Sequence, residues 1–406
     1  EKIYVEKINI SGNYSTLEEV IRNNLIVDEG DPLNEILFNR SINNLKSLGI
    51  FKKVDTDIQN GSEETLKVID INIEERLSGE ISLQAGFGTS GEILGGGIKE
   101  KNFLGQGINL DANIELTPET VKGRFIYAKP NFRNSENTLF TSLKSSTTDL
   151  LTDSGYKTSE LGFSLGTKFE QFQNIFLSPE IDFLVEDLDT SSKASDVLKK
   201  QEGSYTDLYF NYSINQDLRD RKFRTESGYQ TFFSQEVPLI SDNSEFSNAF
   251  EVTKYKRLST KSDTVGKISF FAKTITGLSD DVRISKRLNI PSYKLRGFEK
   301  NRVGPIDNDD YVGGNHVAAL NMSATLPNIV EDLDNLDVGV FLDAANLWGL
   351  DYNSSLDDKS TIRTSAGVAF NLLTPIGPLS FSFANALTKA SSDKTETFRF
   401  RLGTQF

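Results

Sequence analysis

From Gly79 to Phe406, apolar and polar residues alternate strictly in many short runs. Alternation with a period of two is typical of strands that bury only one face. Clear examples are Phe125/Tyr127, Leu161/Phe163/Leu165, Leu379/Phe381/Phe383 and Phe398/Phe400/Leu402. The pattern predicts sixteen strands, which begin near residues 80, 92, 106, 121, 136, 157, 173, 203, 227, 245, 263, 314, 335, 361, 377 and 396.

The spacing of these strands suits a membrane. Each strand with its connection takes about 20 residues, which leaves room for a crossing of roughly 9–11 residues and one loop. A closed barrel with an even number of strands pairs every backbone donor and acceptor within its wall, as a bilayer requires. We therefore expect a 16-stranded antiparallel transmembrane β-barrel over residues 78–406. A soluble double sandwich is the alternative for this pattern.

Residues 1–77 have a different pattern, in which runs with a helical period lie between alternating runs. Ser15 or Thr16 is the expected cap of the first helix, and Gly49 is expected to end the second. The elements are a strand, two helices and two strands, expected over residues 3–10, 17–25, 33–48, 51–58 and 66–74. This β-α-α-β-β order predicts one small α+β domain with its own core.

The composition excludes several classes of protein and site. The chain has 44 Lys+Arg against 58 Asp+Glu, a net charge of −14, which argues against a nucleic-acid-binding protein. It has no Cys and a single histidine, His316, which excludes disulfides, thiolate sites and multi-histidine metal sites. No stretch approaches 18 consecutive apolar residues, so no transmembrane helix is expected. The 28 Phe residues suit strands that have one apolar and one polar face.

Three motifs resemble catalytic or metal-binding signatures. Gly86–Gly91 matches GxGxxG, but Gly95-Gly96-Gly97 follow where a dinucleotide site needs a helix. Gly162–Gly166 matches GxSxG, but its serine, Ser164, stands inside an alternating strand rather than at a sharp turn. The run Asp307–Asp310 lacks the glycine and the terminal Glu of a calcium loop. We expect no catalytic residue, no cofactor, no metal and no enzyme activity.

Residues 278–313 form the longest stretch of the C-terminal part without clear alternation. Long loops in compact domains are usually functional or disordered. This loop contains Tyr293, Phe298 and Tyr311, which favour burial, and Arg296, which needs a carboxylate partner wherever it is buried. The loop is therefore expected to be functional.

With this loop the chain resembles the outer-membrane assembly factors of the BamA type, whose relatives act in two-partner secretion and organelle import. The family's (V/L/I)-R-G-(F/Y) tetrad is present as Leu295-Arg296-Gly297-Phe298. A second family motif, F-x-D-x-G/A, is present as Phe341-Leu342-Asp343-Ala344-Ala345. The runs Gly313-Gly314-Asn315 and Thr374-Pro375-Ile376-Gly377-Pro378 are also similar to this family.

The resemblance extends to the N-terminal domain, which looks like a POTRA domain, the periplasmic module of this family. The opening Tyr4-Val5-Glu6, the run Asn9–Asn13 and Glu29-Gly30-Asp31-Pro32 are similar to the POTRA domain nearest the barrel. The chain is therefore expected to be the last POTRA domain, residues 1–77, followed by the barrel.

The resemblance implies that the loop 278–313 folds into the barrel, where Arg296, Gly297 and Phe298 form a latch with Asp343. Many members of the family have an acidic residue on the strand after GGN, where this chain has Ser323. Asp343 is therefore the expected partner of Arg296. The alternative for Arg296 is a turn residue exposed to solvent.

The function that the resemblance implies is the assembly of β-barrel proteins through a lateral gate between the first and last strands. Glycine weakens a strand, and the residues expected to weaken the first strand are Gly79, Gly86 and Gly88. The residues expected on the last strand as a lipid-facing girdle or insertion signal are Phe398, Phe400, Leu402 and Phe406. An opened seam would present an unpaired edge that binds a client strand.

The implied location is the outer membrane of a Gram-negative bacterium, with the POTRA domain in the periplasm. The implied partners are unfolded outer-membrane β-barrel clients, outer-membrane lipid, accessory lipoproteins of an assembly complex and periplasmic chaperones, without nucleic acid. Three alternatives stay open at this stage: a two-partner secretion pore that exports a soluble client through the lumen, a passive channel, and an organellar relative with one POTRA domain.

Overall fold

The structure, a computed structural model, describes residues 2–89, 91–222, 224–259, 263–327, 335–353, 355–356, 360–374 and 377–403. Within these ranges, no helix is both long and apolar enough to cross a membrane.

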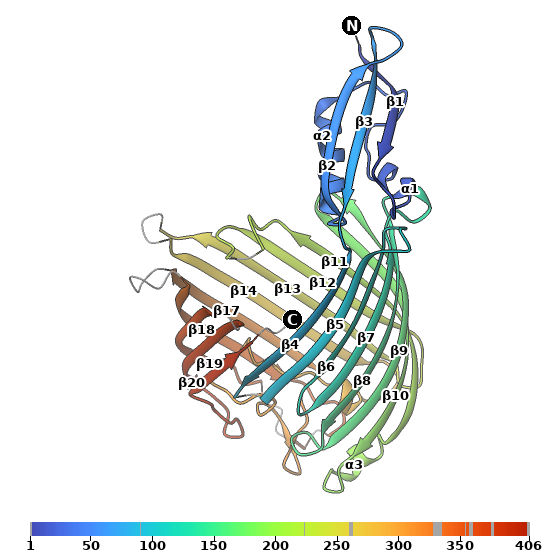
Figure 1. Cartoon of the computed structure of the whole chain (residues 1–406). Helices are drawn as coiled ribbons and strands as arrows, with labels where there is room; N and C mark the ends of the chain where they lie inside the picture. Colours follow the sequence, from blue (N-terminus) through green and yellow to red (C-terminus); the bar gives the residue numbers. More distant parts are fainter. Residues whose placement is uncertain are drawn as a thin grey trace. The chain divides into compact units, whose positions relative to one another are not determined.

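The N-terminal elements follow the predicted order β-α-α-β-β (Figure 1). They are β1 (Tyr4–Ser11), α1 (Glu18–Arg22), α2 (Glu35–Ser47), β2 (Phe51–Asn60) and β3 (Leu66–Glu75). The sheet has the strand order β1-β3-β2, with β1 parallel and β2 antiparallel to β3. Alternate residues of β3, Ile69, Ile71 and Ile73, are buried in one core with Ile21 of α1 and Leu45 of α2. The amphipathic patterns of the two helices and of β3 thus meet in a single small core.

One local prediction in this domain is wrong. Neither Ser15 nor Thr16 caps α1, whose N-cap is Leu17, a residue without a capping side chain. The backbone N–H groups of Ser15 and Thr16 donate instead to the carboxylate of Glu75. Burial opposes ionisation of this carboxyl, but the hydrogen bonds from Thr16 and Ser15 hold the pKa of Glu75 below its ordinary value.

The second helix begins two residues after its predicted start and ends before Gly49, as expected. The side chain of Asn34 accepts hydrogen bonds from the N–H groups of Ile36 and Leu37, which caps α2 at its N-terminus. Gly49 follows the C-cap Leu48 with φ = +68°, the left-handed conformation in which glycine is favoured.

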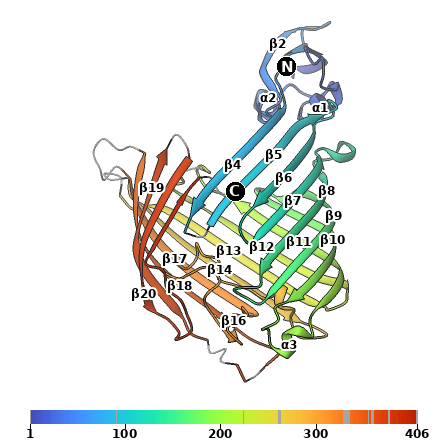
Figure 2. The same cartoon turned by 60° about the horizontal axis from the view of Figure 1, so that its bottom comes forward.

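The remaining long strands form one closed barrel of sixteen strands (Figures 1 and 2). They are β4 (Gly79–Gly88), β5 (Gly91–Phe103), β6 (Ile108–Leu116), β7 (Thr120–Lys129), β8 (Thr138–Leu150), β9 (Tyr156–Phe172), β10 (Ile175–Thr190), β11 (Gly203–Asp217), β12 (Gly228–Ser241), β13 (Glu245–Arg257), β14 (Val265–Gly277), β17 (His316–Pro327), β18 (Leu336–Trp348), β19 (Arg363–Thr374), β20 (Gly377–Thr388) and β21 (Phe398–Leu402). The predicted fold class is confirmed, and each predicted strand start lies within two residues of the observed one.

The alternation along β10 separates an apolar outward face from a polar inward face. On β10, Ile181 and Phe183 are 40% and 42% exposed, whereas Asp182 and Glu186 at the alternate positions are buried. A membrane barrel requires apolar side chains toward lipid and permits polar ones inside. The same alternation explains the GxSxG match, because Ser164 is a buried residue inside β9 and does not lie on the sharp turn that the catalytic motif needs.

The short elements lie between the long strands. They are η1 (Phe132–Asn134), α3 (Asp196–Lys199), η2 (Ile284–Lys286), β15 (Ile306–Asp307) and β16 (Asp310–Tyr311). Three of them, η2, β15 and β16, belong to the loop 278–313, whose residues Leu295 and Phe298 are 2% and 1% exposed.

The chain forms two compact units. The first comprises Glu1–Ser82, Gly96–Asn113 and Arg124–Ser142, and the second comprises Leu83–Gly95, Ile114–Gly123 and Leu143–Phe406. The predicted domain boundary after residue 77 falls between the end of β3 and the start of β4 and stays a prediction.

Candidate functional site

Arg296 of the loop makes a bidentate ion pair with Asp343 of β18. Its Nε and Nη2 atoms each lie 2.7 Å from a carboxylate oxygen of Asp343, and its backbone N–H donates to the same group at 3.2 Å. The guanidinium carbon lies 3.4 Å from the centre of the Phe341 ring. Asp343 is 0% exposed. Planar pairing and stacking of this kind fix the guanidinium in one orientation.

Alternation along β18 explains why Asp343 faces the loop. Phe341, Asp343 and Ala345 are buried on the inward face, while Val340 and Leu342 are exposed on the outward face. The first, third and fifth residues of the family motif therefore lie on one face of the strand, and the central carboxylate points to the interior.

The two residues that follow Arg296 pack tightly. Gly297 has φ = +87°, and a Cβ atom there would lie 3.1 Å from the Cβ of Ala384 and 3.4 Å from that of Ser365. A side chain at position 297 would strain the backbone and crowd the adjacent strands β19 and β20. Phe298 belongs to a buried apolar cluster with Leu295 and Leu347.

Ser323 is not part of the pair. The third group at Asp343 is Asn321, whose Nδ2 donates to the Asp343 carboxylate at 2.8 Å and to the carbonyl oxygen of Lys294 at 2.7 Å. Sequence reasoning considered only charged partners and therefore missed this amide. Its signal was its place two residues before Ser323, on the same face of β17.

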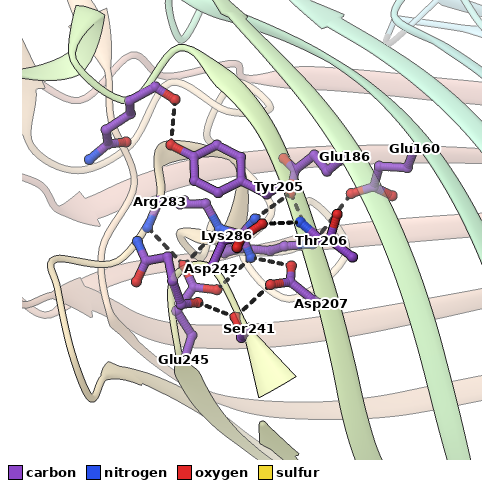
Figure 3. A network of polar contacts seen from close by, with 12 residues as sticks. Glu160, Glu186, Tyr205, Thr206, Asp207, Ser241, Asp242, Glu245, Arg283 and Lys286 are labelled. Atoms are coloured by element: carbon purple, nitrogen blue, oxygen red, sulfur yellow. Dashed lines mark hydrogen bonds and ion pairs between the residues drawn. The ribbon is translucent and has the colours of Figure 1, made fainter. Parts of the chain in front are cut away.

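A second cation, Arg283, anchors the beginning of the loop (Figure 3). Its side chain is 0% exposed and pairs with Asp207 at 2.6 Å, Glu245 at 2.9 Å and Glu186 at 3.3 Å. The guanidinium carbon also lies 4.5 Å from the centre of the Tyr205 ring. Three carboxylates from β10, β11 and β13 thus converge on one loop residue.

Lys286, three residues after Arg283, joins the same network through Glu186. Its Nζ lies 3.4 Å from both Glu160 of β9 and Glu186 of β10. Four wall carboxylates therefore share two loop cations, and an unpaired charge would be very costly around Arg283, where the side chains are at most 2% exposed.

Two further cations fix the middle of the loop. Arg287 pairs with Asp351 and donates to Asn315 of the GGN run, while Lys294 pairs with Glu251 of β13. Burial opposes ionisation of Asp351, but the neighbouring Arg287 guanidinium holds the pKa of that carboxyl below its ordinary value.

Of the five loop cations described above, only Arg296 was predicted from the sequence. The signal for the others was the density of Arg and Lys over residues 283–294, opposite inward-facing carboxylates on alternating strands.

The seam between β21 and β4 is short among the described residues. Only two pairs of residues are in register, Arg401 with Gly88 and Leu402 with Phe87, whereas β10 and β11 have fourteen. One more hydrogen bond runs from the N–H of Thr89 to the carbonyl oxygen of Phe400 at 3.1 Å.

Glycine permits the close backbone approach at this seam. A Cβ atom at Gly88 would lie 2.3 Å from the carbonyl oxygen of Phe400, and one at Gly86 would lie 2.9 Å from that of Leu402. Gly79 differs, because it begins β4 and lies near the side chain of Glu100 rather than near β21.

The terminal-strand residues form an aromatic row. Phe398 is 40% exposed, its ring stacks on that of Phe400 with centres 6.1 Å apart, and Phe400 meets Phe87 across the seam at 5.8 Å. Leu402 continues the same face of β21. Phe406 lies outside the described residues, as do Pro375 and Ile376 of the run 374–378.

A cavity of about 500 Å³ joins the seam to the loop. It is lined by residues that include Gly86, Gly88, Tyr293, Arg296, Arg399 and Phe400. Among the described residues, no group of three or more His, Asp or Glu side chains is arranged to hold a metal ion. In the run Asp307–Asp310, Asp307 accepts hydrogen bonds from Ser195 and Tyr352.

Two family models match the chain. One, described as the Omp85 superfamily domain, matches residues 102–406, and one, described as POTRA, surface antigen variable number repeat, matches residues 3–76.

The chain is similar to a protein called outer membrane protein assembly factor BamA from Neisseria meningitidis serogroup B. The two are 25% identical over 463 residues, which cover 100% of this chain and 57% of that protein. The chain thus spans little more than half the length of this relative.

Two solved structures have a similar fold. BamA from Haemophilus ducreyi lacking POTRA domains 1–3 superimposes with a TM-score of 0.84 at 22% identity, covering 100% of this chain and 85% of that one. CdiB from Acinetobacter baumannii superimposes with a TM-score of 0.60 at 13% identity, covering 99% of this chain and 74% of that one.

Proposed function

Because the chain belongs to the Omp85 superfamily, we propose that it assembles β-barrel proteins into the outer membrane through a lateral gate between β4 and β21. It is an outer-membrane protein with a periplasmic POTRA domain. The proposed partners are unfolded barrel clients, outer-membrane lipid, accessory lipoproteins and periplasmic chaperones.

The observation that carries this proposal is the short seam. Among the described residues, the seam has two pairs in register beside glycines, which leaves far fewer backbone hydrogen bonds to break than the fourteen pairs between β10 and β11. A parted seam exposes the edge of β4, and an exposed edge binds another strand through its backbone. The client's own burial in lipid supplies the driving free energy, so the proposed mechanism needs no nucleotide.

In the proposed mechanism, the loop is a fixed structural element beside the gate. We assign Arg296, Gly297, Phe298 and Asp343 the role of a latch that holds the loop against β18. Removing one partner of such a buried pair leaves an uncompensated charge, which is strongly destabilising. The latch therefore keeps the wall beside the seam in one shape while the seam itself parts.

Export of a soluble client through the lumen is the alternative. The similarity between CdiB and this chain is limited to the fold. The loop packs against the inner wall through two buried apolar clusters and a charge network, so we expect export through the lumen to require its displacement. Strand capture at the seam requires no such displacement.

A disulfide across the seam tests the proposal. The chain has no Cys, so Phe87→Cys with Leu402→Cys, at paired positions, gives one defined crosslink. The control is Phe183→Cys with Leu208→Cys, which staples β10 to β11. In proteoliposomes, the oxidised seam variant should lose assembly of a client barrel and regain it on reduction, while the control stays active. Full activity of the oxidised seam variant would refute the gate.

A further inference from the structure

Residues 297–302, which we name the strap, are joined to the segment that leads into β21. The N–H of Glu396 donates to the carbonyl oxygen of Gly297 at 3.1 Å, and the N–H of Glu299 donates to that of Lys394 at 3.0 Å. The N–H of Lys394 donates in turn to the carbonyl oxygen of Arg302 at 3.0 Å. The strap and residues 394–396 are thus paired like two short strands.

A side chain of β21 strengthens this attachment. Arg399 donates to the carbonyl oxygen of Phe298 at 2.6 Å and to that of Ser292 at 2.8 Å. Phe298 itself is 1% exposed and forms an antiparallel bridge with Thr395. Backbone pairing, a buried ring and a charged donor therefore fasten the strap to the C-terminal side of the seam.

On the other side of the seam, the polar contacts of the strap within the described residues are two ion pairs. Lys300 lies 2.7 Å from Glu119, in the turn between β6 and β7. Arg302 pairs with Asp153, in the turn between β8 and β9. Both turns belong to strands that follow β4 in the barrel order, so the two pairs reach across the seam.

The two attachments differ in strength. The side chains of Lys300 and Glu119 are 40% and 28% exposed, and those of Arg302 and Asp153 are 21% and 25% exposed. Partly exposed ion pairs contribute little each and are weakened by salt. The backbone bonds on the β21 side have no such dependence.

We propose that the strap is a releasable fastener of the seam. Its ion pairs to Glu119 and Asp153 hold the seam closed, and they separate when β21 moves away from β4 with the strap still attached. This inference rests on the proposed gate for its biological meaning, but the fastener itself is a property of the free protein.

Spin-label distances test the fastener without any client. Phe87 of β4 and Phe383 of β20 are exposed and pair with Leu402 and Phe398 of β21, so Phe87→Cys with Phe383→Cys places labels on the two sides of β21. The full chain in lipid nanodiscs should show a short and a long distance. Glu119→Gln with Asp153→Asn should raise the ratio of long to short distances by about two- to thirtyfold, the range that two partly exposed ion pairs supply.

Salt and charge exchange sharpen the test. Raising the salt to 1 M should shift the native protein toward the long distance and leave the double variant unchanged. Lys300→Glu with Glu119→Lys should restore most of the native ratio. The matched control is Asp149→Asn with Asp187→Asn, which removes two exposed carboxylates that pair with neighbouring strands instead of the strap.

The outcomes separate the strap from the gate. Unchanged distances in Glu119→Gln with Asp153→Asn would overturn the fastener, even if the seam disulfide still blocks client assembly. A shift equal to that of the control pair would overturn it as well. A specific shift supports the fastener, even if the disulfide-locked protein assembles clients at the full rate and the gate therefore fails.

Discussion

The two ends of the long loop hold the barrel in different ways. At its beginning, Arg283 is fully buried among three carboxylates of β10, β11 and β13, strands that pair with their neighbours over nine or more positions. At the strap, Lys300 and Arg302 make partly exposed ion pairs beside a seam that has two pairs in register in the part of the chain that the structure describes. A charge that is buried fixes a wall permanently, while a charge near solvent can be released.

The largest effect is expected at the buried end. Arg283→Ala leaves Glu186, Asp207 and Glu245 without their shared cation, at a cost of about 3–5 kcal/mol in the free energy of unfolding. Urea unfolding in detergent, followed by the loss of the compact form on unheated gels, measures this cost. Arg283→Lys keeps the charge and should lose less. Equal stability of Arg283→Ala and the native protein would remove the distinction between the two ends.

The latch comes next. Arg296→Ala removes both guanidinium hydrogen bonds and leaves buried Asp343 with the amide of Asn321 and the backbone N–H of residue 296, at an expected cost of about 2–3 kcal/mol. The same unfolding assay, together with client assembly in proteoliposomes, gives the readout. Arg296→Lys is the control, because it keeps a charge but cannot pair in a planar, two-pronged way. A neutral result for both variants would favour an exposed turn residue without a structural role.

A smaller and more local effect is expected at the seam. In Gly88→Ala, the new Cβ would lie 2.3 Å from the carbonyl oxygen of Phe400, so β4 must move away from β21 at a cost of about 1–3 kcal/mol. The rate of disulfide formation between Phe87→Cys and Leu402→Cys should fall. Gly123→Ala on β7 is the matched control, because nothing lies within 4 Å of its added Cβ. An unchanged rate in Gly88→Ala would mean that the seam is already parted at this position.

The smallest effect concerns pH. The pKa of Asp351 is lowered in the folded state, since Arg287 outweighs the cost of burial. A lowered pKa contributes stability above the ordinary pKa of the carboxyl, and this stability is lost as the pH falls through the folded value. The native protein should therefore lose up to about 1 kcal/mol more than Asp351→Asn between pH 6 and pH 3. Parallel stability curves for the two proteins would show that this pair does not couple folding to pH.

The strands of the wall could be predicted because their signal is local. A period of two needs no knowledge of neighbours, and turn residues mark where each run ends. The cap of α1 could not be predicted in this way, because Glu75, sixty residues away, takes the N–H groups of Ser15 and Thr16. Sequence-local rules fail where a distant residue competes for the same group.

The same division holds for the site. The pair of Arg296 and Asp343 lay within reach of the sequence, since both residues stand in recognisable motifs. The network around Arg283 could not be predicted from the sequence. It depends on the strand register, which brings residues of β10, β11 and β13 to one level along the barrel axis. No pattern in the chain encodes that level, which follows from the tilt and stagger of the closed wall.

The seam shows a third case. Glycines at 86 and 88 indicated a weak strand, but not that their missing side chains admit the carbonyl oxygens of Leu402 and Phe400. The glycines therefore weaken β4 and also permit its closest contact with β21. Only the geometry of the closed barrel reveals the second effect.

The charge network around Arg283 also links the loop to the hydration of the interior. Glu186, Asp207 and Glu245 stand on three different strands, and the counter-ion that they share comes from the loop. Without the docked loop, each carboxylate must be hydrated or protonated, because an isolated buried charge is very costly. We therefore expect water to surround these carboxylates before the loop docks and to leave them when Arg283 arrives.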